Sequence, residues 1–256
     1  MAYTPVTALL RGLKVLEAVN RIGPATLTEV REATGLPKAS ALRALETLCH
    51  GGYVAQDGES RRYLVAARSL ALSNNYRADA ALLAAGRPVM QRLREASGWP
   101  SDLAIYQAGK MAIADTNRQP GTFSVNRTVG SRVSVMRTAI GRAYLAFSTE
   151  AQRAAILEDL VAGGDADERE AGDAARVAAL VERTRERGYA VSDREFVPTI
   201  RAAAVPVMHH GRVLCAFNLI ALAQAVPLAT FEDTYIPMLK EARARIEAAL
   251  SEAGDG

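Results

Sequence analysis

The stretch TLTEVREATGLPKASALRALETLCHGGY, from Thr26 to Tyr53, decides the fold of the N-terminal part of this chain. Apolar residues recur at helical spacing before Gly35 and again after Pro37, so the pattern predicts two short helices joined by a tight turn. Proline suits the start of a helix, because the N–H that it lacks has no partner there, and Gly51-Gly52 predicts the end of the second helix. Small, basic and hydroxyl side chains open that helix, as in a helix-turn-helix that reads DNA, although any two-helix hairpin would show the same periodicity.

The segments on either side of this hairpin strengthen the DNA-binding interpretation. Val6–Asn20 carries leucine and valine at helical spacing and predicts a preceding helix. Tyr53–Gln56 and Arg62–Val65 are short strand candidates around a turn, which adds a small β-hairpin, the wing of a winged helix-turn-helix. Arg61 and Arg62 at this wing are suited to phosphate or minor-groove contacts, whereas a solvated charge pair is the alternative for such a dipeptide.

The excess positive charge lies in the same part of the chain. Residues 1–75 contain nine Lys or Arg and six Asp or Glu, whereas the remaining 181 residues contain 22 of each. The whole formal net charge of +3 therefore belongs to the segment with the hairpin. This distribution suits contacts with a phosphate backbone there and no nucleic-acid role for the rest of the chain.

Length and composition indicate a packed globular protein. The chain has 256 residues, of which 49% are hydrophobic and 23% charged, enough for one large domain or two ordinary ones. We expect a cytoplasmic protein without membrane contact, because the sequence starts with no signal-peptide pattern and its longest apolar stretch, Val213–Ala223, is too short to span a bilayer. Cys49 and Cys215 stand in apolar patterns and predict buried free thiols, with redox sensing as the alternative.

After the wing, the pattern predicts an α+β domain built around an antiparallel sheet. Helices are expected over Arg68–Asn75, Ala78–Gly98 (with a fresh start at Pro88), Thr138–Ser148, Glu150–Leu160, Ala174–Arg187 and Phe231–Ala249. Strands are expected over Asp102–Gln107, Met111–Thr116, Thr122–Val129, Ala202–Met208 and Arg212–Ala221. The acidic, glycine-containing stretch Gly163–Asp173 is expected to be a surface loop.

No motif favours an enzyme. The sequence lacks a GxSxG elbow, a P-loop and a GxGxxG stretch. Its three histidines, His50, His209 and His210, stand in no ligand or triad pattern, so His209-His210 is interpreted as a polar turn, with a metal role as the alternative. We therefore expect no catalytic activity, no metal and no cofactor.

Several stretches, taken in order, resemble the IclR family of bacterial transcriptional regulators. They are GLPKASALRALETL with GGYV and the arginine-containing wing, then Val129-Gly130-Ser131-Arg132 with RTAIGRAYLAF, then RGYAVSDREF, and finally IRAAAVPVMHHGRVLCAFNLIALA. The resemblance extends from Val6 to Leu250. RTAIGRAYLAF and Gly-Trp-Pro-Ser-Asp-Leu-Ala are most similar to the branch that controls aromatic-acid catabolism, such as the hydroxyphenylpropionate regulators.

The resemblance implies a regulator of three parts. These are a winged helix-turn-helix domain over 1–68, a linker helix over 69–80 and a GAF/PAS-like effector-binding and oligomerisation domain over 81–256. Its partners would be double-stranded operator DNA, a small organic acid as effector, and further copies of the chain in a homodimer or tetramer; contact with RNA polymerase is left open. Two other interpretations remain, namely a C-terminal domain that only oligomerises and a sensor of small acids of the glyoxylate or pyruvate type.

For DNA, we expect the start of the second hairpin helix to enter the major groove. Lys38 and Arg43 are suited to guanine or phosphate, Ser40 to either, and Leu42 to a thymine methyl group. The backbone amides near Thr26 are suited to a phosphate at a helix N-terminus. The complete predicted set is Thr26, Lys38, Ala39, Ser40, Leu42, Arg43, Arg61 and Arg62.

For the effector, the resemblance implies contacts at the start of the RTAIGRAYLAF helix, after the Gly-Tyr-Ala-Val turn and on the last strands. The predicted set is Arg137, Thr138, Ala139, Ile140, Asp193, Ala202, Asn218 and Ile220. Arg137 is suited to a bidentate carboxylate pair or to an ordinary ion pair, Asp193 to an effector contact or to a cap, and Trp99 to a pocket wall or to the core. Small-acid sensors carry Cys or Ser where this chain has Ala202, Asn218 and Ile220, which favours a larger or more apolar effector.

Overall fold

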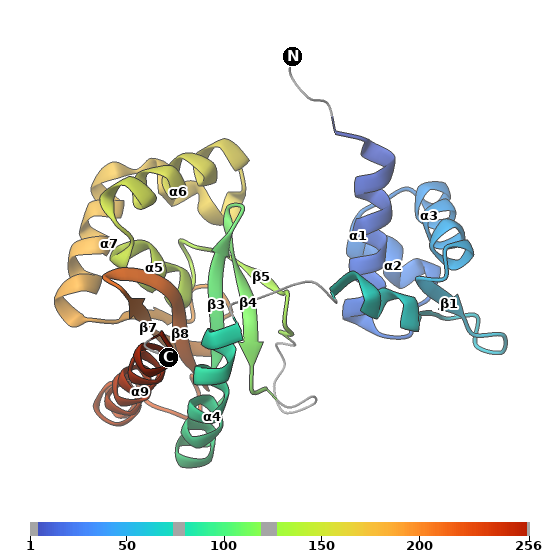
Figure 1. Ribbon diagram of the computed structural model, residues 1–256. Coiled ribbons are helices and arrows are strands. Elements are labelled where there is room, and N and C mark those ends of the chain that lie inside the picture. The colour runs from blue at the N-terminus through green and yellow to red at the C-terminus, as the bar shows by residue number, and fades with distance from the viewer. Residues whose placement is uncertain (1–4, 74–79, 119–126, 255–256) are drawn as a thin grey trace. The chain divides into compact units, whose positions relative to one another are not determined.

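The computed structural model describes residues 5–73, 80–118 and 127–254. The chain forms two compact units, Met1–Arg77 and Ala78–Gly256, each with its own hydrophobic core (Figure 1). The stretch 69–80, where the sequence predicts a linker helix, starts within a 3₁₀ helix, η1 (Ala67–Ser73), and its residues 74–79 lie outside the described part of the chain.

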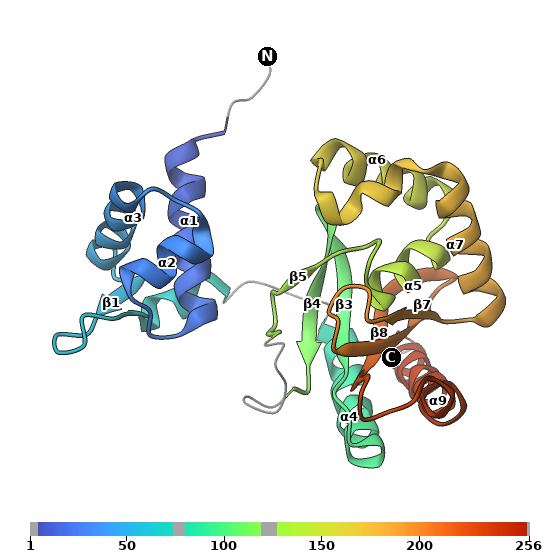
Figure 2. The same ribbon diagram turned by 180° about the vertical axis from the view of Figure 1, so that it is seen from behind.

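The N-terminal unit is a winged helix-turn-helix. Its elements are α1 (Thr7–Ile22), α2 (Leu27–Thr34), α3 (Lys38–His50), β1 (Val54–Gln56) and β2 (Tyr63–Val65). The predicted capping box is confirmed, since the Thr26 hydroxyl accepts from the Glu29 amide and the Glu29 carboxylate accepts from the Thr26 amide at 2.7 Å. Gly35 has a φ of 67°, the left-handed conformation that lets the chain turn from α2 into α3. The antiparallel pair β1–β2 carries the wing, and Figure 2 shows its turn reaching away from the three helices.

The C-terminal unit is built on one antiparallel sheet with the strand order β5-β4-β3-β8-β7-β6. The strands are β3 (Asp102–Gln107), β4 (Lys110–Thr116), β5 (Arg132–Val133), β6 (Ala190–Asp193), β7 (Ile200–His209) and β8 (Arg212–Leu222). Hairpin turns at Ala108-Gly109 and His210-Gly211 join the neighbouring pairs, as the sequence predicts. Most of the predicted strand Thr122–Val129 lies outside the described residues.

Helices cover both faces of this sheet (Figures 1 and 2). On one face lie α4 (Ala80–Ser97) and α9 (Ile236–Gly254), the latter preceded by α8 (Leu228–Thr230) and the π-helical turn η3 (Phe231–Tyr235). On the other face lie α5 (Ala139–Phe147), α6 (Glu150–Gly163), η2 (Ala166–Gly172) and α7 (Ala174–Arg187). Alternate residues of β7 serve the two cores, because successive side chains of a strand point to opposite faces.

Two expectations about these helices are wrong. Pro88 does not begin a new helix, since α4 is continuous through it; the proline is exposed, and burial of Leu82, Val89 and Leu93 against the sheet outweighs one lost backbone hydrogen bond. The stretch Gly163–Asp173 is not simply a surface loop, because it contains η2 and the buried side chain of Glu168. Within the described residues, none of the helices is both long and apolar enough to cross a membrane.

Candidate functional site

The surface of α3 presents most of the residues predicted to read DNA. Lys38, Ala39 and Arg43 are exposed and Ser40 and Leu42 are half-buried, while Ala41 and Leu45 face the core. The helix therefore has one face packed against its own unit and one that is open to a groove of DNA. This division follows from the 3.6-residue period, which places positions 41 and 45 together on the buried side.

The predicted DNA contacts at the wing and at the N-cap of α2 differ in whether their side chains are exposed or bonded within the unit. Arg61 is exposed at the turn, with a φ of 57°. Arg62 instead turns toward its own unit, where its guanidinium donates to the Pro24 carbonyl at 2.8 Å and to Glu29 at 3.2 Å. The Thr26 amide and hydroxyl both donate to the Glu29 carboxylate, and the hydrogen bond from that amide lowers the pKa of Glu29. An internal carboxylate thus already bonds to Thr26 at this helix N-terminus, and the phosphate contact there stays a prediction.

A pocket lies in the C-terminal unit between the start of α5, strands β7 and β8, and the segment that follows β6. It contains about 410 Å³ of empty space including the part open to solvent, of which about 20 Å³ is accessible to the centre of a water molecule. Its lining comprises Arg118, Arg127, Thr138, Ala139, Ile140, Ser192, Phe196, Val197, Ile200, Ala202, Asn218 and Ile220. A space of about one water molecule means that a larger ligand requires some of these side chains to move.

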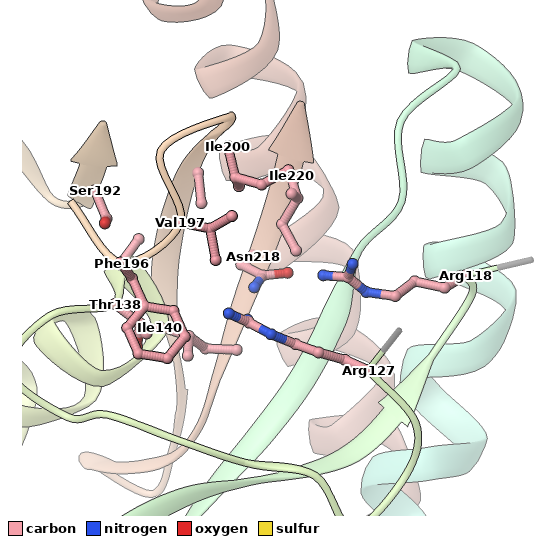
Figure 3. Close-up of a pocket in the computed structure, with 12 residues that line it drawn as sticks. Arg118, Arg127, Thr138, Ile140, Ser192, Phe196, Val197, Ile200, Asn218 and Ile220 are labelled. Carbon is pink, nitrogen blue, oxygen red and sulfur yellow. The ribbon is translucent and has the colours of Figure 1, made fainter. Parts of the chain in front are cut away.

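Two arginines define the polar end of this pocket. Figure 3 shows the guanidinium groups of Arg118 and Arg127 directed toward Asn218. Arg118 donates from Nε and Nη2 to the two oxygens of Asp102, each at 3.0 Å, and Asp102 is fully buried. Asn218 accepts at 2.7 Å from the Asp102 amide, so one residue of β3 orients two groups of the pocket.

Arg127 is held differently. Among the described residues, none supplies a carboxylate within ion-pair distance of its guanidinium, which lies 5.4 Å from the centre of the Phe196 ring. Burial lowers the pKa of Arg127, and the nearby Asp102 offsets part of this effect. A half-buried cation without a bonded carboxylate among the described residues is suited to an anion.

The start of α5 adds backbone donors to the same pocket. Thr138 caps the helix by accepting from the Gly141 amide at 3.2 Å, and its hydroxyl donates to the Ser134 carbonyl at 2.6 Å. The amides of Ala139 and Ile140 are the first two of the helix, where an α-helix supplies no carbonyl partner of its own. A helix N-terminus favours negative charge, so these backbone donors and the two arginines both favour the binding of an anion.

Six of the eight predicted effector residues line the pocket, and Arg137 and Asp193 do not. Arg137 pairs with Asp167 and with the Glu195 carbonyl, so its guanidinium is used to tie η2 and the segment after β6 together. Asp193 forms a bidentate pair with the buried Arg201, at 2.9 and 3.0 Å. In both residues the charge is already bonded to an internal partner, and an effector contact there stays a prediction. Trp99 packs against the core on the opposite face of the sheet.

Sequence reasoning missed Arg118, Arg127 and Phe196. Arg118 directly follows a predicted strand, Arg127 lies inside another, and Phe196 belongs to the RGYAVSDREF stretch. No periodicity distinguishes them from surface residues of the same type. The available signal was that Arg118 and Arg127 flank a stretch without charged residues, 119–126, which follows β4.

Comparison with known proteins identifies both units. Residues 8–58 match the IclR helix-turn-helix domain, and residues 74–248 match the bacterial transcriptional regulator IclR C-terminal domain. The Pca regulon regulatory protein of Pseudomonas putida is 28% identical over 240 residues, which cover 91% of this chain and 80% of that protein.

Solved structures show the same fold. The IclR family transcriptional regulator from Brucella abortus has 26% identity and a TM-score of 0.66, with 96% of this chain and 93% of that one covered. An IclR homolog from Microbacterium hydrocarbonoxydans, crystallised with 4-hydroxybenzoate, has 19% identity and a TM-score of 0.67, with 96% of this chain and 99% of that one covered.

A helix-turn-helix unit followed by an IclR C-terminal domain defines a DNA-binding transcriptional regulator with an effector-binding domain. The chain belongs to the IclR family of bacterial transcriptional regulators. The predicted family, the fold class and the expectation that the chain is a regulator and not an enzyme are thereby confirmed.

Proposed function

We propose that this regulator controls a catabolic operon in response to an organic acid with an apolar body, bound in the pocket at the start of α5. The observation that carries this proposal is Arg127, a half-buried cation of the pocket lining with no carboxylate bonded to it among the described residues. A carboxylate placed there would accept from Arg127 and from the amides that open α5.

The rest of the lining suits a ring or a branched chain better than a two- or three-carbon acid. Ile140, Ile220 and Phe196 present apolar surface, and Asn218 is a polar group at their edge (Figure 3). The similar protein from Pseudomonas putida is named for the Pca regulon, and the homolog from Microbacterium hydrocarbonoxydans contains 4-hydroxybenzoate. At 19% identity the second likeness concerns the fold, so the choice of an aromatic acid rests on the lining.

Calorimetric titration with a panel of monocarboxylates tests this proposal. The panel comprises benzoate, 4-hydroxybenzoate, 3-phenylpropionate, glyoxylate and pyruvate, with benzamide as a neutral control. We expect an aromatic acid to bind, benzamide not to bind, and Arg127→Gln to abolish binding of the acid, since the Arg127 guanidinium is the main charge partner. Binding of glyoxylate or pyruvate alone would favour the small-acid sensor, and binding of none would favour a C-terminal unit that only oligomerises.

We further propose that the protein acts in the cytoplasm as a homodimer through α1. The helix carries two apolar faces: Val15, Ala18 and Val19 are buried in its own unit, whereas Val6, Leu9, Leu10 and Leu13 are exposed. Their exposed fractions are 60, 62, 55 and 46%, high for a stripe of four large apolar side chains at spacings of three and four. A second copy of the same helix would cover this stripe, and a dimer would present two α3 helices to successive half-sites.

A further inference from the structure

Asp102 is the one carboxylate among the described residues that bonds to a charged group of the pocket lining. It is fully buried on β3, behind Arg118, and Asp193 and Glu195 nearby are bonded instead to Arg201 and Arg142. Its oxygens accept from Arg118 twice and from the Thr116 hydroxyl at 2.7 Å, and its amide donates to Asn218 at 2.7 Å. Asp102 is thus built into the pocket wall and does not occupy the pocket itself.

The charges at this end of the pocket can be counted from these contacts. Arg118 and Arg127 each contribute +1, and Asp102 contributes −1 and neutralises Arg118, with which it forms a bidentate pair. Arg127 is therefore the single positive charge left for a ligand within the described residues. One carboxylate of a ligand would neutralise the charge of Arg127. A second carboxylate would find no remaining positive charge and would lie near the carboxylate of Asp102.

We propose that Asp102 sets the charge selectivity of the effector pocket, so that singly charged carboxylic acids bind and dicarboxylates of the same shape are rejected. This inference rests on the proposed function, because it takes the pocket to be the effector site. Asp102 is a positioning residue: it acts through Arg118 and Asn218. Substitution of Asp102 should therefore change the affinity for a diacid relative to that for its half-amide. Substitution of a residue that only stabilised the fold would weaken the binding of both ligands alike.

The test compares ligands that differ in charge and hardly in shape. Two pairs are titrated against the full chain by calorimetry: isophthalate with 3-carbamoylbenzoate, and succinate with succinamate. The wild-type protein should bind one of the half-amides at least about tenfold more tightly than its diacid, since burying an uncompensated charge is costly. Equal or tighter binding of both diacids, or binding of neither half-amide, overturns the proposal without any variant having to fold.

The same titrations on Asp102→Asn test whether the selectivity for singly charged acids depends on this residue. The substitution preserves size and raises the local charge from +1 to +2, so the diacid should gain at least about tenfold relative to its half-amide. Asp115→Asn is the matched control, because Asp115 pairs with the exposed Arg87 at 2.8 Å and does not line the pocket. An unchanged ratio in Asp102→Asn overturns the role of Asp102. The proposed function fails separately, if the wild-type protein binds no organic acid of either set.

Discussion

The backbone of Val135 passes directly against Gly141 of α5. A Cβ atom built on Gly141 would lie 2.3 Å from the Val135 carbonyl oxygen and 2.4 Å from its Cα. The chain before α5 and the first turn of the helix can approach this closely only because position 141 has no side chain. The amides that open α5 toward the pocket depend on this contact for their position.

Gly141→Ala should therefore destabilise the C-terminal unit, by about 1–3 kcal/mol or more, since backbone and not a flexible side chain must move. Thermal and denaturant unfolding measure the loss. Gly163→Ala is the matched control within the same unit, because a Cβ there meets nothing within 4 Å. A Gly141→Ala protein as stable as Gly163→Ala would contradict the close approach.

Glu168 is the buried anchor of η2, and its carboxylate accepts from the Val135 and Met136 amides at 3.0 and 2.9 Å and from Lys110 at 2.8 Å. Glu168→Gln puts an NH₂ group among these donors and should cost about 1.5–3 kcal/mol in unfolding free energy. Glu170→Gln, whose partner Arg176 is 64% exposed, should change stability by less than about 0.5 kcal/mol. Equal effects of the two substitutions would show that Glu168 is not an anchor.

Arg43 and Arg61 should contribute to DNA binding in different ways. Arg43 lies on the exposed face of α3, so Arg43→Ala should weaken binding to a selected operator by about 1–3 kcal/mol and leave binding to scrambled DNA nearly unchanged. Arg61 lies on the wing, so Arg61→Ala should weaken both complexes alike and reduce the salt dependence by about one ion. Gel-shift titrations at several salt concentrations separate these outcomes. An unchanged operator affinity of Arg43→Ala would contradict the assignment of α3 as the helix that reads the operator.

The stability of the C-terminal unit should fall in acid. The hydrogen bond from Lys110 lowers the pKa of Asp165; burial opposes ionisation of Glu195, but the hydrogen bonds and charge of Arg142 outweigh it and lower its pKa as well. Because both folded values lie below the ordinary 3.8 and 4.5, their contribution is complete above these values and is lost as the pH falls through the folded ones. Denaturant titrations from neutral pH down to the acid range should show this loss, and Asp165→Asn should reduce it. A flat profile in acid would contradict both ion pairs.

The α1 stripe predicts the assembly. Leu9→Glu with Leu13→Glu should shift the protein from dimer to monomer in sedimentation and weaken operator binding, because each copy would bring two charges into the interface, four in all. Leu64→Glu, at another exposed leucine of the same unit, serves as the control for added charge in the sedimentation measurement. A double variant that remains dimeric would place the subunit contact elsewhere.

The elements that the sequence predicts best depend on local rules. The capping box at Thr26, the stop at Gly188 and the turn at His210-Gly211 each follow from a few neighbouring residues, and the structure has all three. Pro88 was the exception, because the burial of the opposite helix face overrode a local rule. The start of α5 and the last two strands, which line the pocket, were expected there from the family resemblance and not from a local pattern.

Local sequence patterns did not show which charged residues line the pocket and which form internal ion pairs. Arg137 and Asp193 stand at plausible positions in the sequence, but Asp167 and Arg201, 30 and 8 residues away, bond to them. Arg118 and Arg127 face the pocket because Asp102, the strand pairing and Phe196 place them there. The sequence by itself determined the helix-turn-helix with its wing and the hairpins of the C-terminal sheet, since periodicity, caps and turns act between near neighbours. Only the tertiary structure decided which cation of the pocket lining has no bonded carboxylate among the described residues, because ion pairs form between residues that folding brings together.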